Sequence, residues 1–171
     1  QYALSLAKAV FPGIQWWPHE HTIFAKAVAF WEALQPDFST YVRQVIDNAR
    51  IMAKEFGDNG LRVISGGTDN HIILLDIFGS LWLSGKEAEV ILEKVGISCN
   101  KNMIPFDTRK PLDPSGIRLG TPAITTRGFD TENSRILALI IIRALKNHEN
   151  EELLQELKKE VRELCIQFPI P

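Results

Sequence analysis

Apolar residues recur three and four positions apart over most of the chain, which is typical of amphipathic helices. This spacing predicts helices over residues 2–10, from 18 or 19 to about 34, over 38–56, over 84–95, over 130–146 and over 149–165. In the third of these, one face carries Val42, Val45, Ile46, Ala49 and Met52 or Ala53. Shorter apolar runs predict strands over 61–65, 71–76, 97–99 and 117–120, and the stretch 100–114 is expected to be irregular.

Local signals mark where several of these elements begin and end. The sequence Phe11-Pro12-Gly13 predicts a break, and Pro36 interrupts the helical pattern because it pushes the preceding residue out of the helical region. Ser84 with Glu87 has the spacing of a capping box. Gly96 is a predicted helix stop, and Asp130 is a predicted N-cap.

The order of the elements predicts a single α+β domain over residues 1–171. A helical segment over 1–58 comes first, a small sheet with a crossover helix follows over 59–129, and helices close the chain over 130–171. We expect the sheet to be antiparallel or mixed and to pack against the helices.

Composition narrows the class of protein. Of 171 residues, 45% are hydrophobic and 23% are charged, which is ordinary for a globular domain. The formal net charge of −2 argues against a nucleic-acid partner. The longest apolar runs are too short for a membrane span, so no membrane partner is expected. The start of the chain does not resemble a signal peptide, so we expect a cytoplasmic protein.

Two kinds of candidate chemistry are weak. Cys99 and Cys165 could form one disulfide, but their apolar surroundings favour buried free thiols. His19, Glu20, His21 and His71 carry metal-binding groups, but residues two apart do not face one another on a helix. We therefore expect no metal. Neither a nucleophile elbow nor a Walker-type phosphate loop is present in the sequence.

Three segments resemble the C-terminal part of serine hydroxymethyltransferase, the pyridoxal-phosphate enzyme that interconverts serine and glycine with tetrahydrofolate. They are residues 10–15 (VFPGIQ) with 18–21 (PHEH), residues 65–71 (SGGTDNH), and residues 100–102 (NKN) followed by 115–129 (SGIRLGTPAITTRGF). The segments stand in the order and at the spacing of that family. The resemblance implies the fold of the C-terminal domain of a fold-type I pyridoxal-phosphate enzyme.

The resemblance implies a role for two residues. Arg118 matches the arginine that binds the α-carboxylate of the substrate, and a planar guanidinium suits a carboxylate because it can bind both oxygens. Asn102 matches an asparagine that hydrogen-bonds the folate. Without the resemblance, Arg118 would be read as an ion-pair partner and Asn102 as part of a polar turn. For residues 66–71 we expect a tight connection between strands, with glycines where unusual dihedral angles are needed.

The same resemblance implies what this chain lacks. In the family the lysine that binds the cofactor follows a threonine run and a histidine, and no lysine here stands in such a context. We therefore expect no cofactor in this chain and no catalysis by it alone, although the parent family uses pyridoxal phosphate and tetrahydrofolate. Trp16 and Trp17 stand where the family has two glycines that approach the cofactor phosphate of the neighbouring subunit.

Large aromatic residues replace small or polar ones at further positions, namely Phe24, Trp31 and Trp82. Trp17, Phe24 and Trp31 are spaced by seven and would form one stripe if the helix reaches back to Trp17. One interpretation is that these side chains fold inward and fill space. The other is that Trp16, Trp17, Phe24, Trp31 and Trp82 form an engineered interface for a second copy of the chain, giving a homodimer, or for a designed protein partner.

Three hypotheses about function follow. The first is an isolated, engineered C-terminal domain that acts as a non-catalytic scaffold or interaction module. The second is a fragment of an active hydroxymethyltransferase whose other half is supplied separately. The third is a designed binder with the aromatic residues as anchors.

Overall fold

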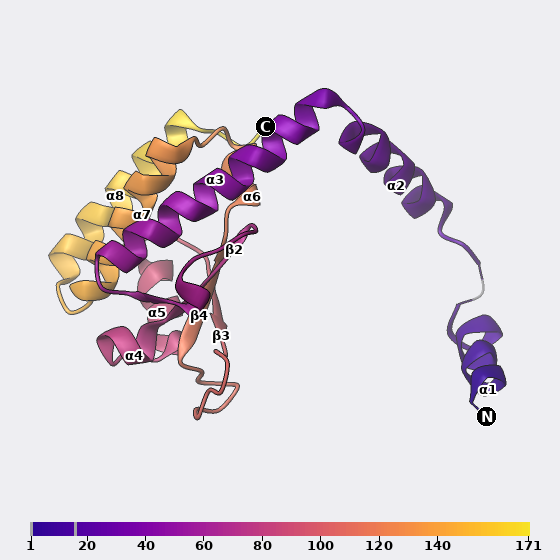
Figure 1. Ribbon diagram of the computed structural model, residues 1–171, viewed down its shortest axis with the longest axis horizontal. Helices are drawn as coiled ribbons and strands as arrows, with labels where there is room; N and C mark the ends of the chain where they lie inside the picture. The colour runs from indigo at the N-terminus through magenta and orange to yellow at the C-terminus, as the bar shows by residue number, and fades with distance from the viewer. Residues whose placement is uncertain (1, 16) are drawn as a thin grey trace. The chain divides into compact units, whose positions relative to one another are not determined.

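The computed structural model describes residues 2–15 and 17–171 of the chain. The chain divides into two compact units, Gln1–Thr40 and Tyr41–Pro171, and Figure 1 draws their elements in chain order. Trp16, one of the candidate interface residues, lies outside the described residues.

The first unit consists of helices whose apolar side chains are exposed. The helix α1 spans Ala3–Lys8, the π-helical segment η1 spans Ala9–Ile14, and α2 spans Glu20–Ala33. Within η1, Phe11 has extended dihedral angles of φ −133° and ψ 125°, which confirms a break in the helix at this position. None of the residues Glu20–Ala33 is buried, although α2 is apolar nearly all round. A helix of this kind requires other surfaces to cover it.

The helix α3 spans Pro36–Asp58 and forms one wall of the core. It begins two residues before the predicted start at Phe38, because proline is well suited to a first helical position, where its missing N–H has no partner to lose. Its buried positions are Val45, Asn48, Ala49, Met52, Ala53 and Phe56. Val42, which was predicted to share this face, is 38% exposed, so the predicted apolar face is confirmed only from Val45 onward.

The second unit contains a four-stranded antiparallel sheet with the strand order β1-β2-β4-β3. The strands are β1 (Arg62–Val63), β2 (Ile72–Asp76), β3 (Asn100–Asn102) and β4 (Gly116–Gly120). The predicted α+β class is therefore confirmed, with an antiparallel rather than a mixed sheet.

One face of the sheet packs on helices. Side chains alternate between the two faces of a strand, and the fully buried ones, Ile73 and Leu75 on β2 and Ile117 on β4, belong to the core. The helices of this unit besides α3 are α4 (Ile77–Leu81), α5 (Gly85–Lys94), α6 (Pro122–Thr126), α7 (Thr131–Lys146) and α8 (Glu151–Gln167). In Figure 1, α5, α7 and α8 gather on one side of the strands.

The helix signals in the sequence are largely confirmed. Ser84 and Glu87 form a reciprocal capping box at the start of α5, and the side chain of Asp130 caps α7. Gly96 has a φ of 84° and ends α5 as predicted. The helix α8 begins at Glu151 rather than at residue 149, because the side chain of Asn150 caps it.

The strand predicted over residues 97–99 is wrong, since the third strand in the chain is Asn100–Asn102. Ile97 N donates to Leu92 O at 2.9 Å and Gly96 N donates to Glu93 O at 2.9 Å. These two bonds form a Schellman-type C-cap. The backbone N–H of Ile97 is therefore used in the C-cap of α5. Pairing with β4 begins only at Asn100, inside the stretch expected to be irregular.

The two short helices α4 and α6 were not predicted. The side chain of Asp76 accepts a hydrogen bond from Gly79 N and caps α4 directly after β2. At α6, the buried Asn48 of α3 donates to Thr125 Oγ1 at 3.0 Å and to Phe129 O at 2.9 Å. These partners are distant in sequence from Asn48, so no local pattern reveals that α6 is held against α3.

Two glycines allow three backbone segments to meet near the start of β4. Gly85 N donates to Pro114 O at 2.7 Å, and a Cβ atom built on Gly85 would lie 2.1 Å from Gly116 O. A Cβ atom on Gly116 would lie 2.6 Å from Leu75 O. Both contacts are with backbone atoms, which cannot move aside as the end of a flexible side chain can.

The two thiols are free, as expected, but Cys99 and Cys165 are half-buried rather than fully buried. Burial raises the pKa of the Cys99 thiol to about 12, with a smaller contribution from the nearby Glu89 carboxylate. Over residues 2–15 and 17–171, the helices are too short or too polar to cross a membrane.

The close approach at Gly85 predicts a large effect of one methyl group. We expect Gly85→Ala to lower the free energy of unfolding by about 2 kcal/mol or more, since overpacking typically costs 1–3 kcal/mol and the colliding atom belongs to the backbone. Gly57→Ala in α3 is the matched control, because nothing lies within 4 Å of its added Cβ atom. It should be neutral or stabilising by about 0.5–1 kcal/mol. Urea denaturation measures both, and equal effects would contradict the packing at Gly85.

Candidate functional site

The pairing of β3 with β4 places Asn102 and Arg118 on the same face of the sheet. Asn100 pairs with Arg118, and Asn102 pairs with Gly116. Directly paired residues lie on the same face, and Ile117 between them points into the core. Arg118 and the two asparagines therefore lie on the face opposite the packed helices.

Arg118 is exposed on this face. Its guanidinium forms neither a hydrogen bond nor an ion pair with the residues that the structure describes, so the ion-pair role that an isolated arginine suggests is not observed. The neighbouring position on β2 is Leu74, which is half-buried. The guanidinium donors are therefore available to a carboxylate from outside the chain.

Asn102 is half-buried at the end of β3. Its Nδ2 atom donates to the carbonyl oxygen of Met103 at 2.7 Å. This bond holds the side-chain amide against the backbone where the chain leaves the sheet.

The connection between β1 and β2 was predicted over residues 66–71 and is longer in the structure. The strand predicted over 61–65 ends at Val63, because Ile64–Gly66 form a 3-10 helix, η2, instead of its last residues. Gly66 has a φ of 70°, which confirms a glycine in the left-handed region, and Ser65 adopts a similar φ of 65°. Thr68 Oγ1 donates to Ile72 O at 2.7 Å, and Ile72 N donates to Asn70 Oδ1 at 2.7 Å. Side chains thus complete the hydrogen bonding at the first residue of β2.

A hollow of about 460 Å³ lies beside this loop and is lined by Ser65–Asn70, Ile72 and Leu74. Ile72 and Leu74 belong to the same face as Arg118, since Leu74 pairs directly with Arg118. The hollow therefore extends the open face of the sheet toward β1.

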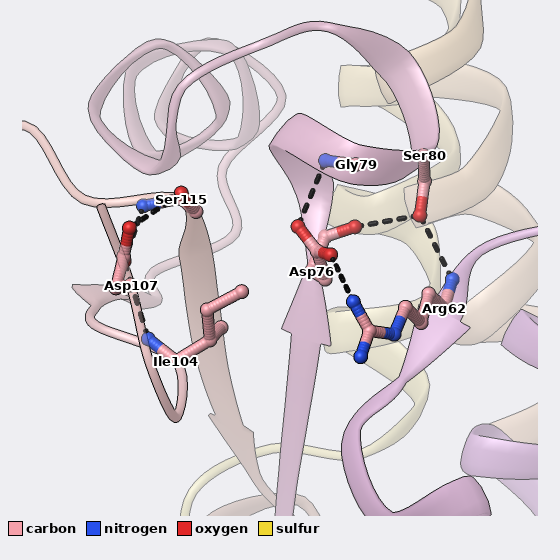
Figure 2. Close-up of polar contacts among 7 residues, drawn as sticks. All are labelled: Arg62, Asp76, Gly79, Ser80, Ile104, Asp107 and Ser115. Carbon is pink, nitrogen blue, oxygen red and sulfur yellow. Dashed lines mark hydrogen bonds and ion pairs between the residues drawn. The ribbon is translucent and has the colours of Figure 1, made fainter. Parts of the chain in front are cut away.

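Asp107 closes the connection between β3 and β4 (Figure 2). Its carboxylate accepts hydrogen bonds from Ser115 N at 2.9 Å, from Ser115 Oγ at 2.7 Å and from Ile104 N at 3.3 Å. Arg109 N donates to it at 2.9 Å. Burial alone would raise the pKa of Asp107, but the bonds from Ser115, Arg109 and Ile104 outweigh it and lower the pKa to about 2.

A second carboxylate, Asp76, organises the other end of the same region (Figure 2). It accepts from Gly79 N at 2.8 Å and from Arg62 Nη1 at 3.0 Å, which joins β1 and α4 to the end of β2. Ser80 Oγ donates to the backbone oxygen of Asp76 at 2.6 Å and accepts from Arg62 N at 2.9 Å. The backbone oxygen of Ser115 accepts from Ile77 N at 3.1 Å, so the two carboxylate clusters are linked.

Sequence reasoning missed both carboxylates as supports of the site. A signal was present for Asp76, because an aspartate between a strand and a short apolar segment is a good N-cap. Asp107 has no comparable signal, since its partner Ser115 is eight positions away in the chain.

No lysine joins the open face of the sheet among residues 100–102 and 116–120. Lys101 points to the opposite face, where its Nζ atom pairs with Glu89 of α5 at 2.7 Å. A hydrogen bond from Lys101 lowers the pKa of Glu89. Lys101 is therefore a structural ion-pair partner between β3 and α5.

The histidines do not gather into a metal site. In the part of the chain that the structure describes, no three His, Cys, Asp or Glu side chains lie close enough together to hold a metal ion. The rings of His19 and His21 meet edge to face, with their centroids 5.6 Å apart.

The candidate interface residues that the structure describes are all exposed. The exposed fractions are 76% for Trp17, 72% for Phe24, 64% for Trp31 and 81% for Trp82. Because α2 begins at Glu20, Trp17 precedes the helix, and the seven-residue stripe comprises Phe24 and Trp31 only. Trp82 belongs to the second unit, at the end of α4.

The hydrogen bonds at Asp107 predict a pH-dependent contribution to stability. A carboxyl whose pKa is lowered in the folded protein stabilises it above its unfolded pKa of about 3.9, and this contribution disappears as the pH falls through the folded pKa of about 2. We expect Asp107→Asn to lower the free energy of unfolding by about 1–3 kcal/mol at pH 7. Between pH 4 and 2 the difference from the wild type should shrink. Asp69→Asn, at an exposed position, is the control in the same denaturation experiments. If the free energies of unfolding of the wild type and Asp107→Asn differ by the same amount at pH 4 and at pH 2, the charge of Asp107 does not have this role.

The family model for serine hydroxymethyltransferase matches residues 1–141 of the 171-residue chain. The match includes β3 and β4, with Asn102 and Arg118, and the connection that Asp107 closes. The chain belongs to the serine hydroxymethyltransferase family.

Proposed function

We propose that this chain is a C-terminal domain of a serine hydroxymethyltransferase that by itself acts as a folded scaffold or interaction module without catalysis. The observation that carries the proposal is the composition of the open sheet face. This face presents Arg118 and Asn102 but lacks a lysine among residues 100–102 and 116–120, since Lys101 is paired with Glu89.

Pyridoxal phosphate supplies the electron sink for amino-acid chemistry in this family, and the enzyme holds it through a lysine. The residues on the open face do not fit that requirement, because Arg118 cannot form a Schiff base and remains protonated at all ordinary pH values. We therefore assign no reaction step to this chain alone.

In this proposal the domain retains two contacts to substrates of the family. Arg118 would bind a carboxylate through two parallel N–H···O bonds, for which its unpaired and exposed guanidinium is suited. Asn102 would offer its side-chain amide to a folate from the neighbouring strand.

A second candidate is an active transferase completed by another polypeptide. The unpaired Arg118 favours it, because a guanidinium without a partner on an open face is suited to a ligand held by a second component. This hypothesis predicts turnover when the missing part is added, whereas the first predicts a folded domain with no turnover of its own.

The cofactor experiment separates these possibilities. We expect the purified chain with pyridoxal phosphate to show no lysine adduct at one specific position after borohydride reduction, and no conversion of serine to glycine above the rate of free pyridoxal phosphate. Peptide mapping and an assay for glycine measure the two outcomes. A single modified lysine together with turnover would contradict the proposal.

We further propose that the chain forms a homodimer through the first unit. Trp17, Phe24 and Trp31 are each more than 60% exposed, and large exposed aromatic side chains are typical anchors of interfaces. Fully burying a large apolar side chain contributes roughly 1.5–3 kcal/mol. Three such residues from each of two subunits could offset an association cost of roughly 4–15 kcal/mol.

Light scattering tests this dimer. We expect the wild-type chain to be dimeric at micromolar concentration and the variant Trp17→Ser/Trp31→Ser to be monomeric, because it loses two apolar anchors per subunit. Phe106→Ser is the matched control, since Phe106 is fully exposed in the second unit and is not a candidate interface residue. A wild-type chain that stays monomeric at high micromolar concentration would contradict the proposed homodimer.

A further inference from the structure

The C-terminal end of α3 is followed by the one Asn-Gly pair in the chain, Asn59-Gly60. Asparagine before glycine is prone to deamidation, because a residue without a Cβ atom lets its backbone nitrogen approach the preceding side chain. Asn59 is half-buried and Gly60 is exposed, so water reaches both. A Cβ atom built on Gly60 would have nothing within 4 Å, which leaves space for a ring between the two residues.

Hydrogen bonds hold the two reacting groups apart in the folded chain. The nucleophile of deamidation is Gly60 N, but its N–H donates to Gly57 O at 3.0 Å. The electrophile is Asn59 Cγ, but the Nδ2 atom of the same amide donates to Glu55 O at 2.9 Å. Glu55 lies one helical turn before Asn59, whereas Gly60 follows it. The amide is therefore held toward the body of α3 and away from the nitrogen that would attack it.

These bonds belong to the C-cap of α3. Leu61 N donates to Phe56 O at 2.9 Å, and this bond and the one from Gly60 N to Gly57 O form a Schellman motif. Gly60 has a φ of 83°, the left-handed conformation that this motif requires at its position. Phe56 and Leu61 are both buried in the core, and β1 begins directly after Leu61. The cap therefore sets the path of the chain from α3 into the sheet.

We propose that Asn59 and Gly60 form a deamidation site that this C-cap keeps closed, so that the reaction occurs only after local opening of the cap. In the open state Gly60 N gives its proton to hydroxide and forms a bond to Asn59 Cγ. The Cγ–Nδ2 bond then breaks, and ammonia leaves with a proton taken from water. A second water molecule opens the resulting succinimide at one of its two carbonyl carbons, which gives aspartate or isoaspartate. The site does not involve Arg118 or Asn102 and is independent of the proposed function.

The modification prevents the cap from closing again. Isoaspartate adds one methylene group to the backbone before Gly60, so the N–H groups of Gly60 and Leu61 no longer meet their acceptors on Gly57 and Phe56. Either product also places a carboxylate at the C-terminal end of α3, next to Asp58, where the helix dipole disfavours negative charge. A single slow reaction at this site therefore reports how often the end of α3 opens.

The first experiment compares the reaction in the folded and the unfolded chain. The wild-type chain is incubated at mildly alkaline pH in buffer and in guanidinium chloride, and peptide mapping by mass spectrometry follows the conversion of Asn59 to the acid. We expect the folded chain to react about tenfold or more slowly, because only its open fraction has the reactive geometry. Equal rates in the two states would contradict protection by the cap. An Asn59 that stays intact in the unfolded chain would contradict the site itself.

A pair of leucine truncations separates local opening of the cap from global unfolding. Leu61→Ala removes the apolar residue of the cap, and Leu157→Ala removes an equally large buried side chain from α8. Both destabilise the core, but only Leu61→Ala loosens the cap. We expect Leu61→Ala to raise the rate at Asn59 about threefold or more and Leu157→Ala to change it less than about twofold. Equal acceleration by the two variants would contradict local opening.

A third measurement uses the products and does not depend on the folding of Leu61→Ala. Ion exchange separates the aspartate and isoaspartate forms from the unmodified chain, because each carries an additional negative charge. We expect the midpoint of urea denaturation to be lowest for the isoaspartate form, whose backbone is longer. The variant Asn59→Asp is the matched control for the charge alone and should lie between this form and the wild type. An isoaspartate form that unfolds at the same urea concentration as the wild type would contradict the effect on the cap.

Discussion

The close approach of three backbone segments around Ser115 is the constraint on which the second unit depends. The carbonyl of Pro114 accepts from the first residue of α5, and the carbonyl of Ser115 accepts from the first residues of α4. A Cβ atom on Gly85 would lie 2.1 Å from Gly116 O, and one on Gly116 would lie 2.6 Å from Leu75 O, so neither position has room for a side chain. The Asp107 carboxylate holds the same point from the other side, through Ser115 N and Oγ. One short stretch of chain therefore sets where two helices begin and where β4 enters the sheet.

The site follows from this constraint through the register of the strands. Once β4 starts at Gly116, its second residue points into the core and its third, Arg118, points out. Pairing with β3 then brings Asn102 to the same side. A shift of one residue would bury the guanidinium and expose Ile117, which the packing of the helices does not permit. The face that resembles a substrate site is thus a consequence of how the opposite face packs.

Elements that depend on local chemistry were predictable from the sequence, and those that depend on distant partners were not. The helix that begins after Ser84 and the one that begins after Asp130 could be located because each carries its own cap. The expected strand at residue 97 failed because the C-cap of α5 uses Ile97 first. Arg118 and Asn102 could be named by resemblance, but their common face depends on a pairing that no local signal determines. Asp107 could not be identified, since its function lies in closing a loop.

Because side chains alternate between the two faces of the sheet, the sequence of one face can change during evolution without changing the other. The two residues to which the proposed function assigns substrate contacts, Arg118 and Asn102, lie on one face of the sheet, and the buried side chains of β2 and β4 lie on the other. Substitutions at Asn100, Asn102 or Arg118 therefore remove few contacts from the core. A lineage that lost selection for chemistry could accumulate changes on this face while the domain continued to fold. Persistence of the fold would then say little about persistence of the reaction.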